Sequence, residues 1–82
     1  MIGMLWFDAA QVPLQKKVEK ALQYYSEKHA LSAKVCLVNR MDAIDEDLNA
    51  ISKATGLTVR VDTYIAPNTL LIGQDTPMEI LK

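Results

Sequence analysis

The chain has 82 residues, of which 50% are hydrophobic and 23% are charged, and its formal net charge at pH 7 is -1. This is the composition of a folded globular chain, and it excludes an intrinsically disordered one, which would carry more charge and fewer apolar residues. The near-zero net charge also argues against a surface built to bind nucleic acid or an anionic membrane.

The length limits the stability that a single core can supply. Residues 1–82 are enough for one domain, because single cores span about 50 to 200 residues. The only cysteine, Cys36, cannot form an internal disulfide, and no cluster of Cys and His is present to hold a structural zinc ion. Small domains without such cross-links commonly gain stability by association, so we expect a homodimer or another protein partner.

The N-terminal segment 1–7 is apolar, carries no basic residue before it and is followed by Asp8. It is too short for the core of a signal peptide and far too short to span a bilayer. We therefore expect a cytoplasmic protein that does not insert into a membrane.

The first half of the chain predicts a strand, a long helix and a second strand. Bulky apolar residues on both alternating faces of 4–7 indicate a strand covered on both sides. Pro13 fits the first position of a helix that runs to about His29, with apolar residues at helical spacing. These are Leu14, Val18, Ala21, Leu22 and Tyr25. Segment 34–39 contains four apolar residues in a row, which is typical of a central, buried strand.

A second helical pattern follows the central strand. Asp42 can cap this helix, with Asp45 three residues later, and Gly56 can end it in the left-handed conformation. The buried stripe predicted for it consists of Ile44, Leu48, Ile51 and Ala54.

Two further strands are predicted after Gly56. Strict alternation over residues 57–65 indicates a half-buried edge strand. Residues 66–69 suit a type I turn with Pro67 at its second position. We therefore expect residues 70–72 to return as the inner arm of a hairpin with 57–65. Thr76 and Glu79, with a proline between them, predict one terminal helical turn.

The predicted fold class is α/β, a single small domain in the order β-α-β-α-β-β, with a mixed four-stranded sheet, a C-terminal hairpin and two helices. Right-handed crossovers make the first strands parallel. If both helices cover one face of the sheet, the opposite face is apolar and uncovered, which marks an interaction surface. If they lie on opposite faces, each face is covered only thinly. Both arrangements favour a protein partner.

Polar residues follow the predicted strands at the edge where open α/β sheets bind ligands. Asp8 follows the first strand, Asn39 and Arg40 follow the second, and Asn68 in the turn joins them if the third strand is parallel. An Asp and an Arg in one crevice could bind a small polar ligand or Mg²⁺. The alternative is that Asp8 and Asn39 only bond their own loops and that Arg40 is solvated.

No catalytic residue, metal ligand or cofactor is predicted. Cys36 lies within the central apolar segment, where burial would make its thiol a poor nucleophile. The run of acidic residues near 42–47 is explained by the preference of a helix N-terminus for carboxylates. The chain contains no glycine-rich phosphate loop, no Gly-x-Ser-x-Gly, no His-Glu-x-x-His and no Cys-x-x-Cys.

The sequence thus favours a small cytoplasmic protein-interaction module that acts as a homodimer or an adaptor, rather than an enzyme. One alternative is a small-ligand or Mg²⁺-dependent enzyme with its site at the carboxyl edge of the parallel strands. Another is nucleic-acid binding through the lysines of the first predicted helix. These lysines are Lys16, Lys17, Lys20 and Lys28.

Overall fold

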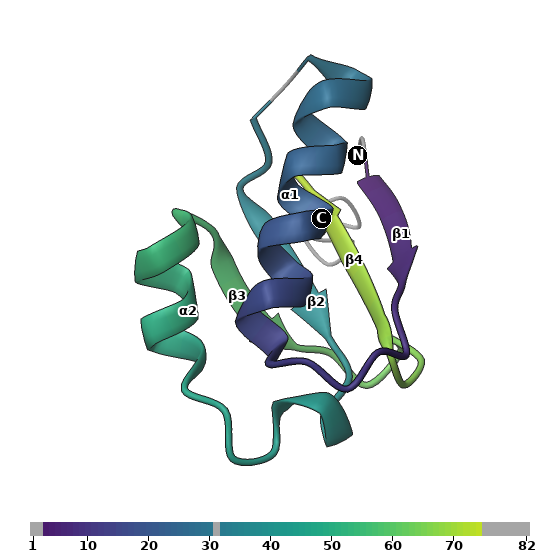
Figure 1. Ribbon diagram of the computed structural model, residues 1–82, viewed down its shortest axis with the longest axis vertical. Coiled ribbons are helices and arrows are strands. Elements are labelled where there is room, and N and C mark those ends of the chain that lie inside the picture. The colour runs from purple at the N-terminus through teal and green to yellow at the C-terminus, as the bar shows by residue number, and fades with distance from the viewer. Residues whose placement is uncertain (1–2, 31, 75–82) are drawn as a thin grey trace, which may run out of the picture.

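A computed structural model of the chain describes residues 3–30 and 32–74, which form a mixed four-stranded sheet, two α-helices and one short 3-10 helix (Figure 1). The α/β class predicted from the sequence is confirmed. The terminal turn predicted at Thr76 to Glu79 lies outside the described residues. The elements in chain order are β1 (Gly3–Phe7), α1 (Leu14–His29), β2 (Val35–Val38), η1 (Met41–Ala43), α2 (Leu48–Thr55), β3 (Thr58–Val61) and β4 (Thr69–Gly73).

The strands lie in the order β1-β4-β2-β3. β4 is antiparallel to both of its neighbours, and β2 and β3 are parallel. The expectations that the last strand is antiparallel and lies inside the sheet are therefore confirmed. The predicted hairpin is wrong, because β4 pairs with β1 and β2 and not with β3.

The strand predicted at 57–65 is shorter than expected, which explains the missing hairpin. The chain turns at Asp62, whose side-chain Oδ1 accepts a hydrogen bond from the Tyr64 N–H at 2.8 Å and whose carbonyl accepts one from the Ile65 N–H at 3.2 Å. Ile65 then packs against Val35 and Leu37 on the sheet instead of continuing the strand. The connection carries the chain past the end of β2, to the other side of that strand (Figure 1).

Helix α1 matches the predicted stripe. Leu14, Val18, Ala21 and Tyr25 are buried against the sheet. Pro13 occupies the capping position immediately before the helix, one residue earlier than predicted. The helix ends after His29, where the left-handed conformation of the following residue satisfies a carbonyl of the last turn.

Helix α2 begins later than predicted, and its cap is a different residue. Asp45 takes a positive φ of 63°, which interrupts any helix that starts at Asp42. Asp47 is the cap, and its Oδ1 accepts the Ala50 N–H at 3.1 Å. Asp42 instead lies in η1. The prediction that Gly56 ends the helix is confirmed, with φ at 77°.

Two residues of the predicted buried stripe are not buried: Ile44, which the later start leaves outside the helix, and Ala54, which lies inside it. Ile44 is 55% exposed, and Ala54 is exposed as well. Ile51 is buried, with 4% of its surface exposed, and Leu48 packs against the same core.

Both α-helices lie on the same face of the sheet (Figure 1). The main core joins their apolar stripes to the residues of the strands that point toward them, which are Cys36, Val38, Val59, Leu70 and Ile72. On the opposite face, Val35, Leu37 and Ile65 form a smaller cluster with Leu71. Residues of one strand alternate between the two faces, so the register of the sheet assigns each side chain to a layer.

The two isoleucines near α2 provide a matched test of this packing. Ile51→Ala should lower the free energy of unfolding by about 2–5 kcal/mol, because it leaves a cavity under a buried side chain. Ile44→Ala should change it by no more than about 0.5 kcal/mol, because that side chain is mostly in solvent. Urea denaturation of the two variants measures both values. Equal losses of stability in the two variants would favour the helix start predicted at Asp42.

Candidate functional site

The structure places the four predicted site residues along one edge of the sheet. β1 and β2 both end there, followed by Asp8 and by Asn39 with Arg40, while Asn68 directly precedes β4. The Asp8 N–H donates to the carbonyl of Asn68 at 2.8 Å, which joins the loops after β1 and before β4.

Several polar groups at this edge are engaged in the loops themselves. Asp8 Oδ1 accepts the Ala10 N–H at 2.9 Å. Asn39 donates through Nδ2 to the carbonyl of Ile65 at 2.7 Å and accepts the Met41 N–H through Oδ1 at 2.7 Å. Arg40 is exposed at the start of η1. A ligand role for the predicted site residues stays a prediction, and these hydrogen bonds favour the structural alternative for Asp8 and Asn39.

Asn68 lies in the turn before β4, and its backbone is hydrogen-bonded to Asp8 after β1 and to Asp42 in η1. Its φ of 60° and the bond from the Thr69 N–H to the Ala66 carbonyl at 3.2 Å make a type II turn, whereas the sequence predicted type I. Its own N–H donates to Asp42 Oδ2 at 2.7 Å. Asp42 therefore ties η1 to this turn instead of capping α2.

Asn39 offers a test between the two roles. Asn39→Ala should lower the free energy of unfolding by about 1–3 kcal/mol, because the Ile65 carbonyl and the Met41 N–H both lose their partner. Asn39→Asp keeps the acceptor and loses the donor, so its stability should fall between Asn39→Ala and the parent. Thermal or urea unfolding measures the series. Unchanged stability in both variants would show that these bonds are dispensable and would favour a ligand role.

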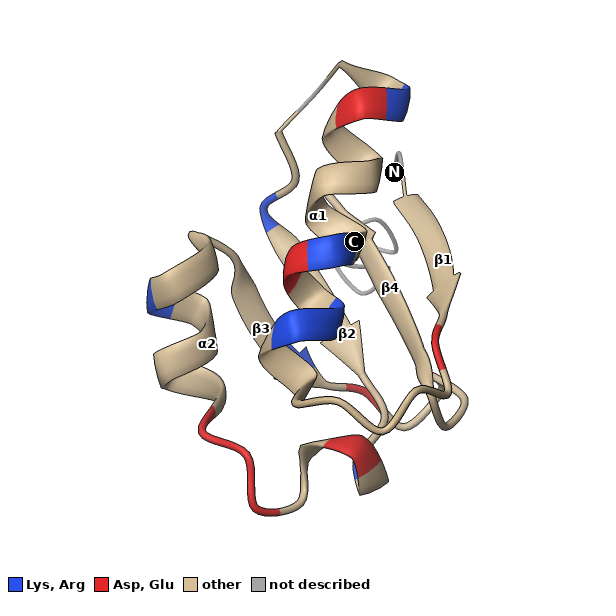
Figure 2. Cartoon of the chain, viewed as in Figure 1, with Lys and Arg blue, Asp and Glu red and all other residues tan. Residues whose placement is uncertain are grey.

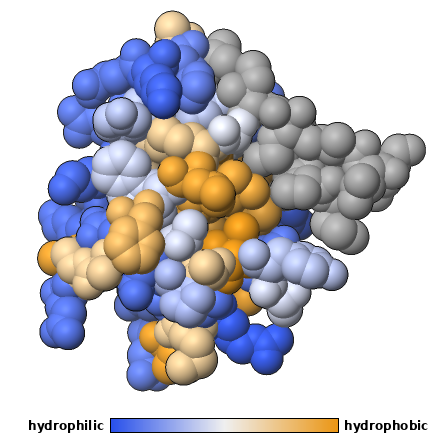
Figure 3. Space-filling model, turned by 90° about the vertical axis from the view of Figure 1, so that its right-hand side faces the viewer, coloured by the Kyte–Doolittle hydropathy of each residue, from blue (hydrophilic) through white to orange (hydrophobic). Residues whose placement is uncertain are grey.

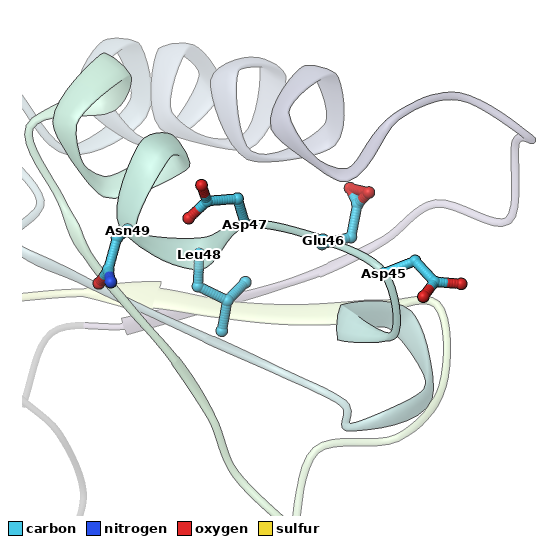
Figure 4. Close-up of a pocket in the computed structure, with 5 residues that line it drawn as sticks. All are labelled: Asp45, Glu46, Asp47, Leu48 and Asn49. Atoms are coloured by element: carbon cyan, nitrogen blue, oxygen red, sulfur yellow. The ribbon is translucent and has the colours of Figure 1, made fainter.

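The acidic segment between η1 and α2 lines a shallow pocket, yet its carboxylates do not converge. Figure 4 shows Asp45, Glu46 and Asp47 extending in different directions, with Glu46 toward the start of α1. Glu46 Oε1 accepts the Leu14 N–H at 3.1 Å, while Asp47 caps α2. Within residues 3–30 and 32–74, no group of three or more His, Cys, Asp or Glu is placed to hold a metal ion.

The bond from Leu14 to Glu46 was not foreseen from the sequence. Helix α1 has no side-chain hydrogen bond from its own cap, Pro13, so one of its first free N–H groups is satisfied by a residue of the distant loop. The only sign of this contact in the sequence is the density of carboxylates after the central strand, which the preference of a helix N-terminus for carboxylates already explains.

Cys36 is buried in the centre of the sheet, and it is not a usable nucleophile. Burial raises the pKa of its thiol from 9.0 to about 12. A nucleophilic cysteine needs an accessible thiolate, which this environment disfavours.

The raised pKa predicts a masked thiol. At pH 8 the folded protein should react with an aromatic disulfide reagent about 1000-fold more slowly than the urea-unfolded chain, because the thiolate population is lower by about that factor. The folded pKa lies above the unfolded one, so the stabilisation from the neutral thiol is complete below pH 9.0 and is lost as pH rises toward about 12. Rapid labelling of the folded chain would contradict the buried placement.

The sheet face without described helices is less open than the sequence suggested. Val35 and Leu37 are buried, and Ile65 packs against them from the loop after β3. The exposed apolar surface lies at the β1 end instead, where Leu5 is 68% exposed and Phe7 is 71% exposed. Figure 3 shows hydrophobic residues gathered on this side of the molecule. Leu5 and Phe7 with the backbone edge of β1 are called the β1 surface below.

The basic face of α1 carries mixed charges and an aromatic contact. Figure 2 shows acidic positions interleaved with the basic ones along this helix. Tyr24 lies beside Trp6, with ring centroids 5.1 Å apart, and Lys28 Nζ lies 6.0 Å from the centre of the Tyr24 ring. Interleaved charges of this kind are typical of a solvated helix face.

A scan against protein-family models found no match, and comparisons with curated proteins and with solved structures found none either. None of the helices in the described part of the chain is both long and apolar enough to cross a membrane. The observations that bear on function are therefore those of this chain's own surface.

Proposed function

We propose that this chain is a small cytoplasmic protein-interaction module that acts as a homodimer or an adaptor, and that the β1 surface is its contact surface. The observation that carries the proposal is the exposure of Leu5 and Phe7, at 68% and 71%, on a strand at the edge of the sheet. A contiguous apolar surface on a small domain is typical of an interaction site.

The composition of β1 supports the same function. Gly3–Phe7 contains no charged residue and no proline. Exposed edge strands in monomeric proteins commonly carry such residues, which block pairing with other chains. Burial of apolar surface contributes roughly 25 cal/mol per Å², so covering two large side chains supplies a useful part of the stability of a small domain.

The polar candidates supply no comparable support for another function. At the carboxyl edge, Asp8 and Asn39 are hydrogen-bonded within their loops. The free thiol of Cys36 is buried and compatible with the reducing conditions of the cytoplasm. A protein contact is therefore the function with the most direct support.

Sedimentation velocity over a hundredfold dilution series tests the proposal. We expect a dimer that dissociates on dilution, and we expect Leu5→Lys to shift its dissociation constant upward by at least about tenfold, because it puts a like charge from each copy in an apolar contact. Met41→Lys is the matched control, since Met41 is 66% exposed and lies in η1. It should leave the dimer unchanged.

A single species of 9.2 kDa at all concentrations would overturn the homodimer. Equal effects of the two lysine variants would show that the β1 surface is not the contact.

A further inference from the structure

The outer side of β1 carries backbone groups that point away from the sheet. The Asp8 N–H bonds to the carbonyl of Asn68, and this pair continues the register in which Trp6 lies opposite Leu70 and Met4 opposite Ile72. In an antiparallel pair, hydrogen-bonded positions alternate with positions whose groups face the other way. Met4 and Trp6 therefore bond to β4. Gly3, Leu5 and Phe7 direct their N–H and C=O groups outward.

We propose that β1 of a second copy of this chain pairs antiparallel with this edge, about a twofold axis at Leu5. The two sheets then form one continuous sheet. This inference rests on the proposed interaction function and names its partner and its geometry. The residues opposite each other across the axis are Leu5 with Leu5, and Gly3 with Phe7 in both directions.

The outward backbone groups select this register. At the axis and on either side of it, each facing pair forms two N–H···O=C hydrogen bonds, because the backbone groups of every residue in these pairs point outward. A shift by one residue would place an outward residue opposite one that is already bonded to β4. A shift by two would leave an end of Gly3–Phe7 without an opposite residue. The register centred on Leu5 pairs the whole strand.

The side chains are complementary in the same register. Phe7 stands opposite Gly3 of the second copy, where the absence of a side chain leaves room for the ring, an arrangement that stabilises glycine in strands. Leu5 meets Leu5 of the second copy on the same face. No charged residue lies in Gly3–Phe7, so two identical edges approach without like-charge repulsion. This self-complementarity favours a second copy over an unrelated strand.

Another dimer would use the same exposed residues without pairing the strands. Two copies could stack their sheets face to face, with Leu5, Phe7 and the half-buried Leu71 in the contact. The two arrangements differ in the distance between the Leu71 side chains of the two copies. In the continuous sheet these residues are three strand spacings apart, or about 14 Å, while stacked faces can bring them together.

Disulfide trapping distinguishes the two arrangements. Leu5→Cys and Leu71→Cys are oxidised under native conditions and analysed on non-reducing gels, with the buried Cys36 as a common background. Residues in a hydrogen-bonded antiparallel pair have Cα atoms about 5.5 Å apart, which suits a disulfide. We expect Leu5→Cys to form a covalent dimer at least about tenfold faster than Leu71→Cys, because the second pair lies beyond disulfide reach.

The register is tested by a mixture of two other variants. Gly3→Cys mixed with Phe7→Cys should give a covalent heterodimer, while each alone should not, because residue 3 faces residue 7 of the second copy. This mixture also serves if Leu5→Cys fails to fold by circular dichroism.

The outcomes distinguish the paired edge, the stacked faces and the homodimer itself. Faster cross-linking of Leu71→Cys would replace the paired edge by stacked faces and would leave the interaction function intact. A wild-type dimer that neither Leu5→Cys nor the mixture traps would also overturn the paired edge alone. A wild-type monomer throughout the dilution series would overturn both the paired edge and the homodimer.

Discussion

The insertion of β4 between β1 and β2 is the constraint on which the rest of the structure depends. Its residues Leu70 and Ile72 lie under α1 in the main core, and its backbone pairs with β1 on one side and with β2 on the other. Among the strands of the described residues, the same insertion leaves β1 with β4 as its one neighbour, at the edge of the sheet. The main core and the β1 surface are therefore two results of one pairing choice.

The sequence determined the elements more reliably than their partners. The stripe of α1 and the four apolar residues of β2 are local patterns, and both were predicted with nearly the observed limits. An apolar segment such as 70–72 can bury both of its faces beside any strand, so its composition does not indicate which strand it pairs with. The start of α2 was missed because Asp42 and Asp47 are both suitable cap residues, and in the structure Asp47 caps the helix while Asp42 accepts the Asn68 N–H.

The candidate site shows the same division between local and distant information. A general rule for α/β sheets puts Asp8 and Asn39 at one edge, and it adds Asn68 because β3 is parallel to β2; the rule needs only the direction of the strands and not their order. The hydrogen bond from Asn39 to Ile65 joins residues 26 positions apart, and no local pattern in the sequence predicts it. The β1 surface was foreseen only as part of a larger apolar face, since the covering position of Ile65 depends on where β3 ends.

The contact between Glu46 and Leu14 makes α1 less independent than its long apolar stripe implies. Glu46, in the segment that leads into α2, accepts a hydrogen bond from the first residue of α1. Asp47 in the same segment caps α2. A local opening of that segment releases amide groups in both helices at once. The two helix starts, although distant in the chain, are thus coupled through one short segment.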